Sequence, residues 1–295
     1  MHTSRLLVGL LLGLAFCVAA KADDARIQHI DIGGRKLTLL TQGTGGPPVV
    51  IEAGYGLPAV ESDQWKPVRD EIARTSQVCI YDRAGLGSSD AVSKKPRTSR
   101  DVAEDLHKLL TAAKIRGPYV LVGHSVGGLH VRVFAGMYPK DVAGVVLVDS
   151  THPDQDSKWL AALGPAQPGE DPAVQRARDF LTSRMTKPAE KPEPLDMAAS
   201  GAQVRAAGAL GNKPLAVVTH SPNWKMVPDL PDEVSKKLED VSQQLQNELA
   251  LLSTDSTHVI ATKAGHHVHV DEPELVVKAI REVVSKARAS TTHSR

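Results

Sequence analysis

The chain contains very little cysteine, and this excludes a fold held together by disulfides. Of its 295 residues only two are cysteines: Cys17 lies in an apolar stretch near the N-terminus, and Cys79 lies in the apolar run QVCIY. We expect Cys79 to be a buried, small apolar side chain. A chain of this length can bury a core large enough to fold without cross-links, so packing must supply the stability.

The sequence also has no excess of charge of either sign. It carries 35 Lys and Arg against 34 Asp and Glu, and without Arg5 and Lys21 of the leader described next the balance is 33 to 34, a formal charge of −1. Proteins that bind nucleic acid or an anionic membrane usually concentrate basic residues. Neither is therefore expected as a partner.

No apolar run is long enough for a membrane-spanning helix. The N-terminal run from Leu6 to Ala20 has 15 residues, where a span needs roughly 20. It follows Arg5 and ends in Ala20-Lys21-Ala22, the layout of a secretory signal peptide with an A-x-A cleavage site. We expect residues 1–22 to be removed, giving an exported, periplasmic or secreted protein that begins at Asp23. A membrane anchor and a lipid-modified Cys17 are the alternatives.

Apolar runs of strand type alternate with segments of helical periodicity along residues 23–295, read as one domain. Alternation with short Gly-rich turns predicts an α/β fold with a mostly parallel sheet covered by helices, and Gly33-Gly34 predicts an antiparallel hairpin at its start. The strand candidates are 26–34, 35–43, 47–54, 77–85, 118–123, 142–149, 213–221 and 257–265; the helix candidates are 65–74, 98–115, the stretch after Ser125, 232–252 and 273–287.

The alternation is interrupted at residues 151–212. This stretch is rich in Pro, Ala and charged residues, and only 171–185 has the character of a helix. We expect it to form a short cap-like insertion over the sheet or a flexible flap, with KPAEKPEPLD at 187–196 as a compositionally loose segment.

One serine stands where a buried strand gives way to a helix. GHSVG, residues 123–127, matches G-x-S-x-G with the strand before it and the helix after it that this motif requires. The serine of such a motif occupies a sharp turn, and the flanking glycines let strand and helix pass closely. Ser125 is therefore the candidate nucleophile, held at a helix N-terminus that favours developing negative charge.

With this motif, VVIEAGYG, CIYDRAGLGSSD and AGHHVHVDEP complete a series whose order and spacing resemble the α/β-hydrolase superfamily, specifically its esterase-like serine hydrolases. The resemblance covers nearly all of residues 23–295 and is least informative over 151–212. It implies an α/β-hydrolase fold with an eight-stranded, mostly parallel sheet and a catalytic triad of nucleophile, acid and histidine.

The resemblance implies His266 as the catalytic histidine, because it follows the last strand candidate in GHHVHVDEP. His267 and His269 are the alternatives, and a metal site formed by the three histidines lacks an acidic or cysteine partner at ligand spacing. His124 should point away from the site and serve packing. His220 and His152 lie near strand ends and either line the pocket or are structural.

The acid of the catalytic triad is less well defined than the serine and the histidine. The family most often places its acid after the strand before the last, but LAVVTHSPNW offers none. A variant uses the end of the strand after the nucleophile, where VVLVDS supplies Asp149 and gives the chain order Ser, Asp, His. Asp149 is the candidate; Asp229, Asp232 and Asp255 remain as alternatives.

The resemblance also implies an oxyanion hole formed by the N–H groups of Tyr55 and Val126, with Gly56 as the alternative to Tyr55. Asp82 and Arg83 match a family motif that is mostly architectural, so we expect them to fix the loop beside the site.

These residues predict an exported hydrolase that cleaves a small-molecule carboxylic ester through an acyl-enzyme, without metal or organic cofactor. An acyltransferase, a C–C bond hydrolase, a peptidase and a non-catalytic binding protein of the same fold are the alternatives. With only three Trp, four Tyr and three Phe, an aromatic-lined pocket is not expected, and aliphatic acyl groups are preferred. The sequence does not indicate the oligomeric state.

Overall fold

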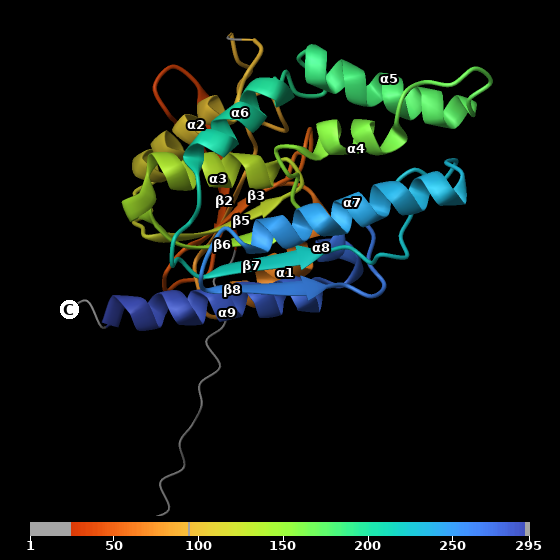
Figure 1. Ribbon diagram of the computed structural model, residues 1–295. Helices are drawn as coiled ribbons and strands as arrows, with labels where there is room; N and C mark the ends of the chain where they lie inside the picture. Colours follow the sequence, from red (N-terminus) through yellow and green to blue (C-terminus); the bar gives the residue numbers. More distant parts are fainter. Residues whose placement is uncertain (1–24, 94, 293–295) are drawn as a thin grey trace, which may run out of the picture.

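The computed structural model describes residues 25–93 and 95–292 and shows a twisted sheet between two layers of helices (Figure 1). Each expected strand range contains a strand. The strands are β1 Arg26–Asp31, β2 Lys36–Gln42, β3 Val49–Glu52, β4 Val78–Tyr81, β5 Tyr119–His124, β6 Val142–Val148, β7 Leu215–Thr219 and β8 Ser256–Ile260.

The eight strands form one mostly parallel sheet, as implied by the resemblance, and their order is β1-β2-β4-β3-β5-β6-β7-β8. β1 and β2 form the expected antiparallel hairpin, and Gly33 and Gly34 between them have φ values of +92° and +97°, which glycine adopts without strain. β2 also runs antiparallel to β4, and the other neighbours are parallel. The carboxyl ends of β5, β6, β7 and β8 therefore meet at one edge.

Alternating side chains of the central strands enter two hydrophobic cores, one on each face of the sheet. Val49 and Ile51 of β3 belong to the core under α1 and α9, whereas Val50 belongs to the core under α2 and α3. The helices are α1 Lys66–Ile72, α2 Ser99–Ala112, α3 Gly127–Met137, α4 Gln155–Leu163, α5 Pro172–Thr186, α6 Met197–Ala207, α7 Asp232–Ala250, α8 Val268–Asp271 and α9 Pro273–Thr292, with short 3-10 turns at Asp63–Trp65 and Pro139–Asp141.

Residues 151–212 form three helices between β6 and β7, where the sequence indicated one. Figure 1 shows α4 and α5 stacked above α7, on the side of the sheet opposite α9. Trp159 of α4, Leu181 of α5 and Leu238 of α7 meet in a small hydrophobic core of their own. This core attaches the helices to α7 and keeps them over the carboxyl edge of the sheet.

The C-terminal half of 187–196, the segment of compositionally loose sequence, is held in place by hydrogen bonds. The Arg97 N–H donates to Pro194 O at 2.7 Å, the Asp196 N–H donates to Arg97 O at 2.8 Å, and Glu193 is 2% exposed. Proline and charge made the segment look unstructured, but a buried ion pair and backbone pairing to a distant segment hold it in place.

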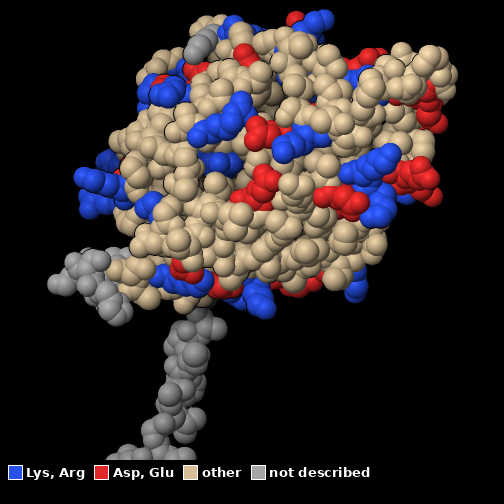
Figure 2. All heavy atoms as spheres, in the orientation of Figure 1, with Lys and Arg blue, Asp and Glu red and all other residues tan. Residues whose placement is uncertain are grey.

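Basic and acidic side chains are interspersed on the face seen in Figure 2. Among the described residues, no helix is both long enough and apolar enough to cross a membrane. The expected signal peptide at 1–22 lies outside the described residues.

Candidate active site

Ser125 lies on a sharp turn between β5 and α3 that only glycines at its flanks can accommodate. Its φ is +54°, which is rare for a residue with a side chain. A Cβ on Gly123 would lie 2.8 Å from Gly127 O, and a Cβ on Gly127 would lie 2.3 Å from Glu52 O. Because those contacts are with backbone atoms, the strand and helix could not stay this close with any larger residue.

His266 lies on the loop after β8, and its Nε2 is 2.9 Å from Ser125 Oγ. Carboxylates at the junction between α8 and α9 fix this loop: Asp271 accepts from the Gly265 N–H and Glu272 accepts from the Ala264 N–H, both at 2.9 Å. The His124 ring packs against those of Trp65 and His269, and its Nε2 lies 3.0 Å from His266 O. The histidine is thus held by its backbone from two sides.

Asp149 lies just beyond β6, and its Oδ2 is 2.5 Å from His266 Nδ1. The structure therefore brings Ser125, His266 and Asp149 into one hydrogen-bonded chain. The alternative acids are elsewhere: Asp229 is exposed, Asp232 pairs with Lys225, and Asp255 pairs with Lys286 at 2.6 Å.

The other two histidines of the GHHVH segment take different positions. His269 is fully buried and stacks on Trp65 with ring centroids 4.0 Å apart. His267 is half-buried, with its ring 5.4 Å from that of His266. Among the described residues, no three His, Cys, Asp or Glu side chains are arranged to hold a metal ion.

A second histidine contacts Asp149 from the other side. His220 directly follows β7, its Nδ1 lies 2.6 Å from Asp149 Oδ1, and its Nε2 lies 2.9 Å from Glu239 Oε2 of α7. Burial alone would raise the pKa of Asp149, but hydrogen bonds from His220 and His266 outweigh it and lower that pKa below its usual range. The sequence placed His220 near a strand end, where it either lines the pocket or is structural, and it did not indicate Glu239; in the structure His220 lines the cavity.

The two N–H groups named from the sequence come from different segments: Tyr55 lies on the loop after β3, and Val126 directly follows Ser125. In residues 25–93 and 95–292, the N–H groups of Tyr55 and Val126 donate no hydrogen bond, whereas the Gly56 N–H donates to Glu193 Oε2 at 3.2 Å. The N–H groups of Tyr55 and Val126, which the sequence named as donors, are therefore available to a ligand, whereas the Gly56 N–H already donates to Glu193.

Arg83 fixes this loop, as expected from its motif. Its guanidinium donates to the carbonyls of Ala53 and Gly54 at 2.8 and 2.7 Å and pairs with Glu52 and Glu193, both at 2.7 Å. Burial would raise the pKa of Glu193, but the charge of Arg83 and its hydrogen bonds lower it to about 2. Glu193 comes from the segment that looked loose in the sequence.

Asp82 fixes the same loop further along. Its Oδ1 accepts the N–H groups of Ala59 and Val60 at 2.6 and 3.0 Å. Both residues of the motif are therefore bound to the chain around the site, and their expected architectural role is confirmed.

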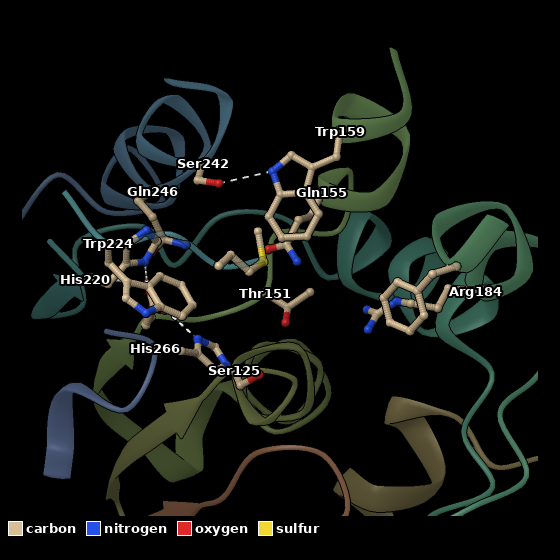
Figure 3. A pocket seen from close by; sticks show the side chains of 13 residues that line it. Ser125, Thr151, Gln155, Trp159, Arg184, His220, Trp224, Ser242, Gln246 and His266 are labelled. Atoms are coloured by element: carbon tan, nitrogen blue, oxygen red, sulfur yellow. Dashed lines mark hydrogen bonds and ion pairs between the residues drawn. The ribbon is translucent and has the colours of Figure 1, made fainter. Parts of the chain in front are cut away.

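A cavity of about 240 Å³ lies over Ser125 and His266, beneath α4 and α5 (Figure 3). The expectation that its wall would not be aromatic is wrong: Trp159, Phe180 and Trp224 all line it. The chain has few aromatic residues, but the fold gathers two of its three Trp here. The remaining wall residues are Asp149, Thr151, Gln155, Arg184, His220, Met226, Ser242 and Gln246.

Comparison with known proteins agrees with this arrangement. A sequence model described as the alpha/beta hydrolase family matches residues 49–279. The chain is 30% identical over 244 residues to the uncharacterized protein YqjL of Bacillus subtilis, a match that covers 82% of this chain and 85% of that protein.

Solved structures show the same fold at lower identity. A thermophilic esterase from Thermogutta terrifontis gives a TM-score of 0.58 with 22% identity and covers 89% of this chain and 99% of its own. A 2-hydroxy-6-oxo-6-phenylhexa-2,4-dienoate hydrolase from Rhodococcus gives 0.57 with 17% identity, covering 88% and 98%. At these identities the likeness establishes the architecture and not the substrate.

Proposed function

The chain belongs to the alpha/beta hydrolase family, and we propose that it is a serine hydrolase that cleaves small carboxylic esters. The observation that carries this proposal is the hydrogen-bonded chain from Ser125 Oγ through His266 to Asp149, with distances of 2.9 and 2.5 Å. A hydroxyl becomes a useful nucleophile only when a base removes its proton, and a histidine serves as that base only when its other nitrogen is held as a donor.

In the proposed reaction, Ser125 Oγ forms a bond to the acyl carbon while its proton passes to His266 Nε2. The Tyr55 and Val126 N–H groups stabilise the oxyanion. The bond to the alcohol then breaks, and the alcohol leaves with the proton from His266. A water molecule, deprotonated by His266, attacks the acyl-enzyme and releases the carboxylic acid, which restores Ser125.

The cavity favours a small substrate. Its volume of about 240 Å³ lies below the range of roughly 300–1,000 Å³ typical of small-molecule sites. Trp159 and Phe180 come from α4 and α5, so the helices inserted between β6 and β7 would determine which acyl group fits. We expect acetyl to butyryl esters to be hydrolysed faster than esters of long acyl chains.

The test is hydrolysis of p-nitrophenyl esters from acetyl to long acyl chains, comparing the wild type with Ser125→Ala. The Ser125→Ala variant should lose the enzyme-dependent rate, and Ser157→Ala, on an exposed serine of α4, should retain it. A fluorophosphonate should add its mass to the peptide that contains Ser125 in the wild type and in Ser157→Ala only.

The outcomes separate the alternatives. Labelling at Ser125 without hydrolysis of any ester would favour a transferase or a C–C bond hydrolase. A folded wild type that shows neither labelling nor turnover would refute the serine hydrolase and favour a binding protein.

We also propose that the protein is exported, on the strength of the leader sequence at residues 1–22. N-terminal sequencing of the protein recovered from outside the cytoplasm should begin at Asp23. A sequence that begins at Met1 would refute cleavage.

A further inference from the structure

The His220 ring lies between two carboxylates in the interior of the protein. Its Nδ1 is 2.6 Å from Asp149 Oδ1, and its Nε2 is 2.9 and 3.1 Å from the two oxygens of Glu239. The side chains of His220, Asp149 and Glu239 are 6%, 4% and 11% exposed. We propose that His220 is a positioning residue: held by Glu239, its ring is a fixed positive group that orients Asp149 toward His266 and offsets part of the negative charge of Asp149.

The geometry indicates that His220 is an imidazolium ion. An ionised carboxylate can only accept hydrogen bonds, so both ring nitrogens of His220 must donate if both contacts are to be favourable. A neutral ring would point one lone pair at a carboxylate. Burial alone would lower the pKa of His220, but the hydrogen bonds from its ring to Asp149 and Glu239 raise it to about 10.

His220 also determines which way the Asp149 carboxylate faces. Oδ1 receives the His220 ring at 2.6 Å and the His220 N–H at 3.3 Å, which leaves Oδ2 for His266 at 2.5 Å. The cation is itself held from α7, because Gln243 Nε2 donates to Glu239 Oε1 at 2.7 Å. Figure 3 shows His220 and His266 on the same side of the cavity, beside Trp224.

A cation bonded to Asp149 offsets the negative charge that His266 faces. The carboxylate stabilises protonated His266, and His220 opposes that stabilisation from the far side of the same carboxylate. Two other titratable rings face His266: those of His124 and His267, with centroids at 4.8 and 5.4 Å. Burial lowers the pKa of both, so at neutral pH they add no positive charge.

Arg184 enters the cavity from α5, but its Nε donates to Asp156 at 2.9 Å, and this partner offsets its charge. Within the described part of the chain, His220 is therefore the cation bonded to the Asp149 carboxylate. The inference rests on the proposed role of His266 as general base.

The decisive variant is His220→Asn, in which the amide nitrogen replaces Nδ1 as a donor to Asp149 while the charge is removed. A single unit charge within one hydrogen-bonded cluster, at an effective dielectric constant of about 20, shifts the pH dependence of a neighbouring group by about one to two units. Without the His220 cation, the Asp149 carboxylate acts with its full charge on the proposed general base, so the acid limb of kcat/KM should move up by about one to two pH units. The negative charge of Glu239, no longer offset by His220, moves the acid limb in the same direction.

His258→Asn is the matched control. His258 lies one strand away on β8, and its ring contacts Thr219 Oγ1 at 2.7 Å and Asn247 Oδ1 at 3.0 Å but not Asp149. This variant should leave the acid limb where the wild type has it. A purely structural role of His220 would lower the rate at every pH without moving the limb.

NMR titration of the histidine ring nitrogens tests the charge without any turnover. Both nitrogens of His220 should remain protonated from pH 5 to pH 8 in the wild type. A neutral His220 ring at pH 7, or an unmoved acid limb in a folded His220→Asn variant, would overturn the inference. If the wild type hydrolyses no ester while NMR shows that His220 is protonated, only the proposed function is refuted.

Discussion

Replacing Asp149 by asparagine changes a carboxylate that accepts hydrogen bonds on both oxygens into an amide that accepts on one side only. In the protein, Oδ2 faces His266 Nδ1 and Oδ1 faces His220 Nδ1. Because His220 carries a proton on each nitrogen, the amide oxygen should turn to His220 and the NH₂ group to His266. His266 Nδ1 must then be an acceptor, which places its proton on Nε2.

The magnitude follows from that tautomer. A histidine with its proton on Nε2 cannot take the proton of Ser125, which lies 2.9 Å from that nitrogen. The corresponding substitution in serine proteases, which share this arrangement, lowers kcat by roughly 10⁴. We expect Asp149→Asn to lower kcat/KM by about 10³–10⁴, or about 4–5.5 kcal/mol of transition-state stabilisation.

The fold should survive, because the amide keeps the shape of the side chain and one of its hydrogen bonds. Losing a hydrogen bond to a charged group costs about 2 kcal/mol, which lowers Tm by about 3–4 °C in a protein of this size. The folded pKa of Asp149 lies below its unfolded value, so the carboxylate stabilises the protein above about pH 4. The difference in Tm should therefore be complete at pH 7 and shrink as the pH falls below 4.

The assay is the initial rate of p-nitrophenyl acetate hydrolysis, with thermal unfolding of each variant measured in the same buffer. Asp232→Asn and Asp255→Asn are matched controls, since both carboxylates pair with lysines outside the cavity. Both should retain the wild-type rate. A folded Asp149→Asn variant with more than a tenth of wild-type kcat/KM would refute the assignment, and equal losses in a control would place the acid elsewhere.

Two further substitutions test the framework of the site. Gly127→Ala places a methyl group 2.3 Å from a backbone oxygen of β3 and should cost about 1–3 kcal/mol by denaturant unfolding, whereas Gly46→Ala, with its nearest contact at 3.6 Å, should have little effect. Equal stability of these two variants would refute the packing argument. Glu193→Gln leaves buried Arg83 with Glu52 as its remaining carboxylate partner, so we expect a loss of about 2–3 kcal/mol and about tenfold in kcat/KM, with exposed Glu190→Gln unchanged in both measurements. A Glu193→Gln variant as stable as the wild type would contradict this expectation.

Local sequence was sufficient to locate the residues whose positions depend on neighbours in the chain. Gly123 to Gly127 predicts a strand, a sharp turn and a helix because backbone clearance alone excludes larger residues, and this fixes where Ser125 stands. The two cores follow from the alternation of apolar residues with strand and helix periods. Because strands and helices alternate along the chain, most strands are parallel and their carboxyl ends meet at one edge of the sheet.

Three features depended on the tertiary structure. Glu193 pairs with Arg83 across 110 positions, and nothing in a stretch of Pro, Lys and Glu distinguishes the buried carboxylate from its exposed neighbours. His220 and Glu239 meet because α7 packs on β7, and both look like ordinary polar residues in sequence. The aromatic wall of the cavity also depended on the fold, because composition gives the number of aromatic residues but not where they lie.

The sequence by itself therefore determined the turn, the elements and the order in which the candidate residues occur. Only the tertiary structure decided the partners of Asp149, the anchoring of the loop after β3 and the lining of the cavity. The physical reason is range: backbone sterics and periodicity act over a few residues, whereas a buried ion pair forms only where packing of whole layers brings two distant side chains out of water together.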